Sequence, residues 1–392
     1  MVRLNPFDRR QNDAPHLPTH RRRSSEDTRI NDRWHGREPY TMDSRPPFLL
    51  WLTVTWLDVL TMLIMGAIAL GVFRARPPAH RTFPIAFENG EVVYPQFAYP
   101  HITQIIPSHA ATALGLGVPI LVILLSQIRV RSFWDINNGI VGLLYSVLSS
   151  TVFQVMIKWL IGGLRPNFLE VCQPDISKAL QPGGNQTGLD GSGYGGIMWT
   201  SDICTREMDG TLSNALESFP SGHTTCMFAG MVYLYLYLNA KLKVFSNYHP
   251  SMWKLVLTYA PILGATLVGG SLTVDQTHNW YDILAGGLIG TMFAFSSYRM
   301  VYASIWDWRF NHIPLHRKLP FEYDLDLVGG GLVVTRKAGW GKRRGSRATQ
   351  PDKLGRTRYT SRSTDGRGAG APRKPLASHH HDDRRPSGDN VV

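Results

Sequence analysis

Three stretches of this 392-residue sequence place cationic or imidazole side chains beside long apolar segments. In the first, Lys158 and Arg165-Pro166 stand at the end of an apolar segment, and the two cations are seven residues apart. Both side chains lie on one face if the helix continues that far. Two cations on one face with no neighbouring acid are typical of a phosphate site. The plainer interpretation is a pair of basic residues that extend to the membrane surface from a helix end.

The second stretch, Pro220-Ser221-Gly222-His223, precedes another apolar segment. Pro and Ser at this place indicate a helix start, where unpaired backbone N–H groups can bind an anion. Gly222 lets a phosphate approach the backbone closely, and His223 adds a titratable proton donor. By itself the stretch also fits a simple helix cap.

In the third stretch, His278 and Asp282 are four residues apart, so their side chains are stacked on one face if this part is helical. A carboxylate beside an imidazole fixes its tautomer and stabilises the positive charge that the ring gains when it attacks a substrate. A structural histidine at a helix start would explain the same pair.

Charge and apolarity are segregated along the chain. The net charge of +12 and the mean hydropathy of −0.13 suggest a soluble basic protein, yet only 18% of the residues are charged and 11% are aromatic. Residues 1–45 and 304–392 hold much of the basic charge and few large aliphatic side chains, which predicts mostly disordered tails. Binding of nucleic acid would rest on charge alone, so we expect none.

Between the tails, residues 46–303 are expected to form one membrane domain. Six apolar segments lie there, each near the roughly 20 residues that a membrane-spanning helix needs. They are about 48–73, 108–128, 136–159, 223–239, 253–272 and 283–302. The predicted fold class is therefore all-α, a bundle of six transmembrane helices with disordered basic tails.

The short loops predict the orientation of this bundle. Basic residues fall on the side that also carries both tails, namely Arg129, Arg131, Lys241, Lys243 and Arg299. The positive-inside rule makes that side cytosolic, with both termini on it. All three polar stretches then converge on the lumenal or extracellular face. A multi-pass protein of the endoplasmic reticulum, Golgi, vacuole or plasma membrane fits this topology.

The long loop at 160–222 on that face has two further features that fit a lumenal or extracellular location. Asn185-Gln186-Thr187 is an N-glycosylation acceptor if the loop is lumenal. Cys172 and Cys204 would pair in an oxidising compartment, although two free thiols fit the sequence equally well.

Taken together, the three stretches resemble the three-part signature of the type 2 phosphatidic acid phosphatase (PAP2) superfamily. The sequence is most similar to the six-span lipid phosphate phosphatases, including the fungal diacylglycerol pyrophosphate phosphatase type. The resemblance covers about residues 48–302 and none of the tails.

The resemblance implies a role for each matching residue. His278 would be the nucleophile that forms a phosphohistidine, with Asp282 orienting it. His223 would protonate the departing alcohol and later activate water. The phosphoryl oxygens would be held by Lys158, Arg165, Ser221 and the backbone of Gly222. No cofactor is implied, because nothing in the sequence resembles a carboxylate or histidine set for Mg²⁺ or Zn²⁺.

One position departs from the pattern. The family has Arg directly after the serine of its third motif, where this chain has Leu272. Loss of such a charge-stabilising donor typically costs about 3–4 kcal/mol. Arg206 in the long loop is a possible substitute, and Asp275 adds negative charge nearby. Asp58, inside the first apolar segment, has no partner that the sequence identifies.

We therefore expect a phosphatidate phosphatase-type hydrolase that acts on membrane lipids without a metal. Its substrates would be phosphate monoesters of lipids such as phosphatidic acid, lysophosphatidic acid or diacylglycerol pyrophosphate. The alternative is a catalytically impaired relative that binds lipid phosphates without turnover, with Leu272 as the cause.

Overall fold

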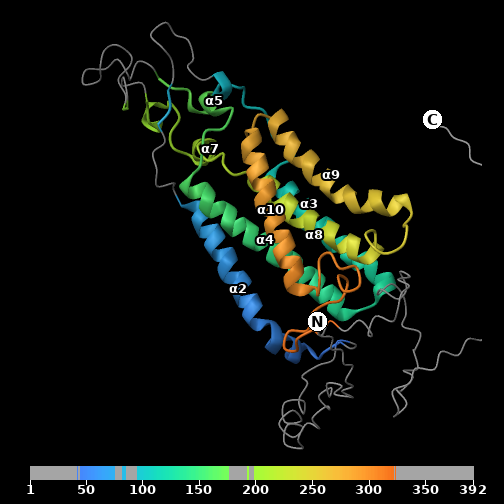
Figure 1. Cartoon of the computed structure of the whole chain (residues 1–392). Coiled ribbons are helices and arrows are strands. Elements are labelled where there is room, and N and C mark those ends of the chain that lie inside the picture. Colours follow the sequence, from blue (N-terminus) through green and yellow to red (C-terminus); the bar gives the residue numbers. More distant parts are fainter. Residues whose placement is uncertain are drawn as a thin grey trace, which may run out of the picture. The chain divides into compact units, whose positions relative to one another are not determined.

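The computed structural model describes residues 42, 45–75, 82–84, 95–175, 192–193, 198–321 and 323. All of these belong to one compact unit, residues 1–342. Most of the expected tails at 1–45 and 304–392 lies outside the described residues, as does the Asn185 sequon. Residues 304–321 are described, and hydrogen bonds from Asn138, Lys241 and Tyr298 hold this segment against the bundle. Within the unit, long helices pack side by side into a bundle, and the short helices α5 and α7 lie beyond one of its ends (Figure 1).

The six predicted apolar segments are all helices, and each boundary lies within three residues of its predicted place. The long helices are α2 (Phe48–Arg74), α3 (Ser108–Val130), α4 (Phe133–Leu160), α8 (Gly222–Leu242), α9 (Met252–Val274) and α10 (Trp280–Val301). The short elements are α5 (Phe168–Cys172), α7 (Gly210–Ala215) and single 3₁₀ turns at Pro95–Phe97 and Ser201–Ile203. In the described part of the chain β-pairing is limited to isolated bridges, so the all-α class is confirmed.

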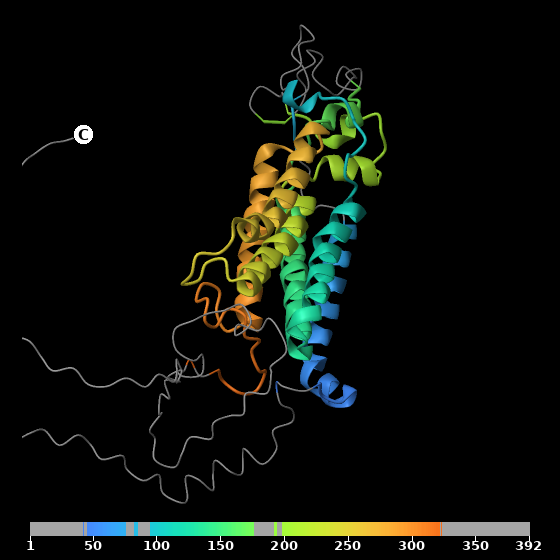
Figure 2. The same cartoon turned by 90° about the vertical axis from the view of Figure 1, so that its right-hand side faces the viewer.

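Four of these helices, α2, α3, α4 and α9, are long and apolar enough to cross a membrane. The other two, α8 and α10, do not meet this criterion, and for α8 the reason is its place in the bundle. Almost every side chain of α8 is buried by α10, α9, α3 and α4, which surround it (Figure 2). A helix covered by protein tolerates polar and tyrosine side chains that lipid would not. A count of six spans therefore remains a prediction.

Small residues let these helices approach closely, as expected where packing replaces a hydrophobic driving force. A Cβ at Gly230 of α8 would lie 1.8 Å from the carbonyl oxygen of Gly115 in α3. A Cβ at Gly290 of α10 would lie 2.5 Å from the carbonyl oxygen of Thr225 in α8. The helix that carries His223 is thereby fixed from two sides.

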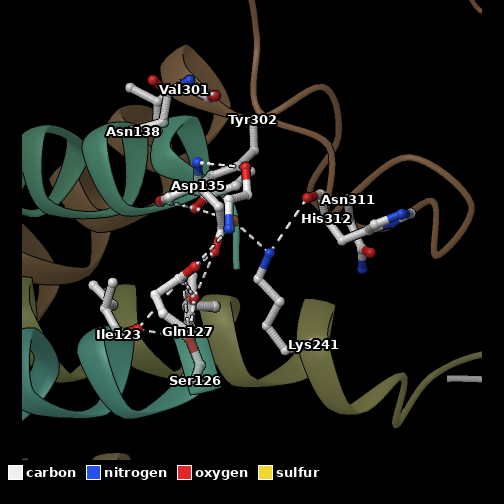
Figure 3. Close-up of polar contacts among 12 residues, drawn as sticks. Ile123, Ser126, Gln127, Asp135, Asn138, Lys241, Val301, Tyr302, Asn311 and His312 are labelled. Atoms are coloured by element: carbon white, nitrogen blue, oxygen red, sulfur yellow. Dashed lines mark hydrogen bonds and ion pairs between the residues drawn. The ribbon is translucent and has the colours of Figure 1, made fainter. Parts of the chain in front are cut away.

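A buried polar cluster ties the helices together at the end of the bundle away from α5 and α7 (Figure 3). Asp135 of α4 forms an ion pair with Lys241 of α8, and both side chains are almost fully buried. Asp135 also accepts hydrogen bonds from Gln127 and Tyr302. Lys241 donates in addition to the backbone carbonyl of His312, at 3.4 Å, so the chain after α10 is fastened to the same cluster.

The acid inside α2 has a partner after all. Asp58 forms an ion pair with Arg317, which also donates to the hydroxyl of Tyr145 at 3.4 Å. Arg317 comes from the segment that follows α10, so no local sequence pattern indicated the pair. A charge on an apolar helix is thus explained by a structural contact.

Beyond the other end of the bundle, an apolar cluster packs around α5 and α7. Its centre is a disulfide between Cys172 and Cys204, which settles the choice between paired and free thiols. Phe83 and Phe168 belong to the same cluster and pack edge to face against each other, at 4.6 Å between ring centroids. The third cysteine, Cys226, is a free thiol buried in α8.

Candidate active site

The stretch after α4 forms a tight turn rather than a longer helix. α4 ends at Leu160, and Gly162 and Gly163 both have positive φ, at 54° and 141°. Glycine adopts these conformations without the penalty that a side chain would bring. The turn pairs with the chain before α8, because Gly163 donates to the carbonyl of Leu216 and accepts from Ser218. The two helical turns expected between the cations are therefore absent, but the turn still directs both toward one cavity.

Lys158 and Arg165 are both buried, with 9% and 5% of their surfaces exposed. Arg165 donates to the backbone carbonyl and side-chain oxygen of Asn214, at 2.7 and 2.8 Å, and to the carbonyl of Thr277 at 3.0 Å. Burial lowers the pKa of Arg165 to about 10, so the guanidinium is still charged at neutral pH.

The expectation that no acid lies near these cations is wrong. The carboxylate of Glu217 lies 3.8 Å from the ammonium of Lys158 and accepts a hydrogen bond from Ser213. Glu217 follows α7, so the contact comes from the long loop. No motif in the sequence pointed to it. The positive charge offered by Lys158 is therefore partly balanced before any ligand binds.

His278 lies in the short connection between α9 and α10, with its Nδ1 3.4 Å from a carboxylate oxygen of Asp282. The same oxygen accepts hydrogen bonds from the Ser218 hydroxyl and from the backbone of Asn279, at 2.5 and 2.9 Å. Asp282 is thereby fixed, and the Nε2 of His278 points away from it. Burial lowers the pKa of His278 well below its usual value, reinforced by the charges of Arg165 and Lys158, so the ring is neutral at neutral pH.

His223 is the second residue of α8 and lies next to this imidazole. The ring centroids of His223 and His278 are 6.3 Å apart, with 71° between the ring planes. The Nε2 of His223 is buried and has no hydrogen-bond partner among the described residues. A buried polar atom without a partner is costly, and a ligand that bonds to it would remove that cost.

Ser221 has the geometry of a helix cap. Its hydroxyl accepts from the backbone N–H and the side chain of Thr224, at 3.4 and 3.2 Å. Its own N–H donates to the backbone carbonyl of Asp282 at 3.1 Å, and Gln154 of α4 binds the carbonyl of Pro220 at 2.9 Å. These bonds fix the start of α8 against α4 and α10.

A cavity of about 950 Å³ connects these groups with the interior of the bundle. Five of the predicted site residues border it, namely Lys158, Arg165, Gly222, His223 and His278. Ser221 and Asp282 do not; Asp282 reaches the cavity only through His278. On α4 the lining extends from Lys158 back to Val147, which is about 16 Å along a helix at roughly 1.5 Å per residue. Val147, Leu116 of α3 and Cys226 make this inner part apolar.

Leu272 and its neighbours occupy structural positions. Leu272 is fully buried, and its carbonyl accepts from the backbone N–H groups of Thr277 and His278, both at 3.1 Å. The carboxylate of Asp275 accepts from the backbone of Ile105 and of Thr277, both at 3.2 Å, which fixes the loop that carries His278. Arg206 lies 3.8 Å from Asp209 and does not border the cavity, so it does not replace the missing cation.

No cluster of three or more His, Cys, Asp or Glu side chains that could hold a metal ion occurs in the described ranges. The cavity thus brings the imidazoles of His223 and His278 together with two buried cations, Lys158 and Arg165, and His278 lies against a carboxylate. This arrangement defines a membrane protein whose polar site opens into an apolar interior.

Comparison with known proteins places this site in a family. The model of the PAP2 superfamily matches residues 139–306. A PA-phosphatase related-family protein of Dictyostelium discoideum is 32% identical over 67% of this chain and 72% of its own length. Lipid phosphate phosphatase 2 of Arabidopsis thaliana is 32% identical over 64% of this chain and 78% of its length. Diacylglycerol pyrophosphate phosphatase 1 of Saccharomyces cerevisiae is 32% identical, over 43% and 54%.

The chain belongs to the PAP2 superfamily, as the resemblance of its motifs predicted. No solved structure matches it.

Proposed function

We propose that the protein is an integral-membrane lipid phosphate phosphatase that works through a phosphohistidine and without a metal. The observation that carries this proposal is the single cavity that joins His278, His223 and the two buried cations to an apolar interior. A phosphate ester of a lipid has both parts, a charged head and an apolar tail. A soluble phosphate ester would leave the apolar part of the cavity unfilled.

The geometry of the two histidines supports the first half-reaction of this proposal. The Nε2 of His278 attacks the phosphorus, since its Nδ1 faces Asp282. The P–O ester bond breaks, and the leaving alkoxide takes a proton from His223. The imidazole becomes positively charged in this step, and the adjacent carboxylate of Asp282 stabilises it.

In the second half-reaction, water attacks the phosphorus of the phosphohistidine. His223, now neutral, takes a proton from that water, the N–P bond breaks, and inorganic phosphate leaves. Lys158, Arg165 and the backbone N–H groups at Gly222 would hold the phosphoryl oxygens throughout, as fixed donors that need no reorganisation. Ser221 would contribute by fixing the start of α8.

The proposed substrates are phosphatidic acid, lysophosphatidic acid and diacylglycerol pyrophosphate, in line with the names of the relatives in Arabidopsis and yeast. We also propose six spans with both termini in the cytosol. The site then lies at the lumenal or extracellular face, where the disulfide between Cys172 and Cys204 would be stable.

A second candidate function is binding of lipid phosphates without turnover, and the observation that favours it is Leu272. No cation stands at that position, and Glu217 reduces the positive charge further. The imidazole of His278 nevertheless lies against the carboxylate of Asp282, and binding alone would not need this pair.

The test is phosphate release from phosphatidic acid in detergent micelles with EDTA present. The protein is compared with His278→Ala and with a matched control, His249→Ala, whose exposed ring is far along the chain from the cavity lining. We expect metal-free activity in the wild type and the control and none above background in His278→Ala. Equal background release from all three would support binding without turnover.

A further inference from the structure

The cavity has a third cation that none of the family motifs contains. Arg74 is the last residue of α2, and with Phe73 and Ala75 it borders the same cavity as Lys158 and His278. Its side chain is exposed and has no ion pair or hydrogen bond among the described residues. An exposed cation that borders a phosphate site is available to a ligand.

Arg74 lies outside the pair of buried cations, Lys158 and Arg165, which we call the inner group. The ring of Phe73 stands 6.0 Å from the ammonium of Lys158, so the last turn of α2 is next to the inner site. Lys158 and Arg165 are buried, whereas Arg74 lies at the exposed end of the cavity. The positive charge around the cavity therefore lies at two positions, the inner group beside the histidines and the outer guanidinium of Arg74.

The inner group alone is poorly matched to a highly charged substrate. Leu272 supplies no charge, and Glu217 lies 3.8 Å from Lys158. A guanidinium that borders the cavity outside the inner cations is placed to contact the group that follows the reacting phosphate. In a lipid monophosphate that group is the uncharged glycerol ester, but in a lipid diphosphate it is a second phosphate, which arginine binds well.

We propose that Arg74 determines substrate specificity by binding the phosphate next to the reacting one, so that lipid diphosphates are preferred over lipid monophosphates. This inference rests on the proposed function. In the reaction, the P–O–P bond breaks and the lipid monophosphate leaves. The terminal phosphoryl group passes through His278 to water and is released as inorganic phosphate. Arg74 takes no part in these bond changes, and it orients the leaving phosphate.

The experiment compares diacylglycerol pyrophosphate with phosphatidic acid of the same acyl chains, in micelles of an uncharged detergent. Arg74→Gln removes the charge, and Arg74→Lys restores it without the planar guanidinium. Arg206→Gln is the matched control, since Arg206 is also exposed but does not border the cavity. The measured quantity is kcat/KM for release of the first phosphate from each lipid.

For Arg74→Gln we expect kcat/KM to fall about tenfold on the diphosphate, the usual effect of one charged hydrogen bond, and to change less than about threefold on the monophosphate. Arg74→Lys should lie between the wild type and Arg74→Gln, and Arg206→Gln should match the wild type. An equal fall on both lipids, or no fall on either, overturns the role of Arg74. If the wild type releases phosphate from neither lipid, the proposed function itself has failed.

Discussion

Gly286 of α10 offers a steric test of how the site is positioned. A Cβ at this residue would lie 2.6 Å from the carbonyl oxygen of Ser221 in α8. Ordinary contacts begin near 3.4 Å, so Gly286→Ala requires a displacement of 3.4 − 2.6, about 0.8 Å. The clash is with backbone, which cannot rotate away, so α10 must move relative to α8.

That movement reaches the proposed catalytic groups directly. Gly286 is one helical turn after Asp282, whose carbonyl accepts the N–H of Ser221 at 3.1 Å. Asp282 in turn orients His278, while α8 carries His223, so the two imidazoles would lose their alignment. A misplacement of roughly 1 Å costs about 10²-fold in rate, and we expect kcat to fall by that order.

The stability of Gly286→Ala should change little by comparison. Alanine favours the helix by about 1 kcal/mol, while overpacking costs about 1–3 kcal/mol. The assay is kcat on phosphatidic acid in micelles together with the thermal unfolding midpoint. Gly264→Ala is the control, because a Cβ there meets nothing within 4 Å. A folded Gly286→Ala protein with the kcat of the wild type would refute the positioning argument.

Three further predictions concern stability and pH. Replacing Cys172 and Cys204 by alanine should destabilise the loop by about 4 kcal/mol, because the disulfide closes a loop of 32 residues in the unfolded chain, and it should also raise KM. A thermal unfolding midpoint equal to that of the oxidised wild type would contradict this prediction. Lys241→Met should cost about 3–5 kcal/mol of unfolding free energy because it leaves Asp135 charged and buried, and Asp135→Asn in the same chain should restore part of it. Strictly additive losses would exclude that pairing. The pKa of His278 is held below its usual 6.5, so on acidification the unfolded chain takes up a proton that the folded chain does not. The free energy of unfolding should therefore fall as the pH drops below 6.5, and this fall should be smaller in His278→Gln.

The sequence predicted the helices well because their signals are local. Apolar runs of about 20 residues, bounded by Pro, Gly and charged residues, gave all six long helices to within three residues. The three polar stretches were expected to meet on one face, and the structure places five of their residues on one cavity.

Contacts between distant segments gave no such signal. Glu217 meets Lys158 only because the turn at Gly162 pairs with the chain before α8. Arg74 borders the cavity because α2 packs against α4, although at the level of sequence it is one more basic residue at a helix end.

For Lys241 and Lys243, a sequence rule assigned a loop position, but contacts with distant segments bury both side chains. The positive-inside rule counts them as charges of a short loop. In the structure both are buried, Lys241 against Asp135 and Lys243 against Asn311. Their role in holding the bundle together depends on partners that come from α4 and from the segment after α10.

The central claim is that His278 carries the phosphoryl group during turnover. The most direct measurement is rapid alkaline quenching of the protein during hydrolysis of ³²P-labelled phosphatidic acid, followed by mapping of the label on the chain. The account predicts a label that is stable in base, lost in acid and located at His278, and no label in His278→Ala. A wild-type protein that turns over without any trapped label, or a label that persists in His278→Ala, would contradict it.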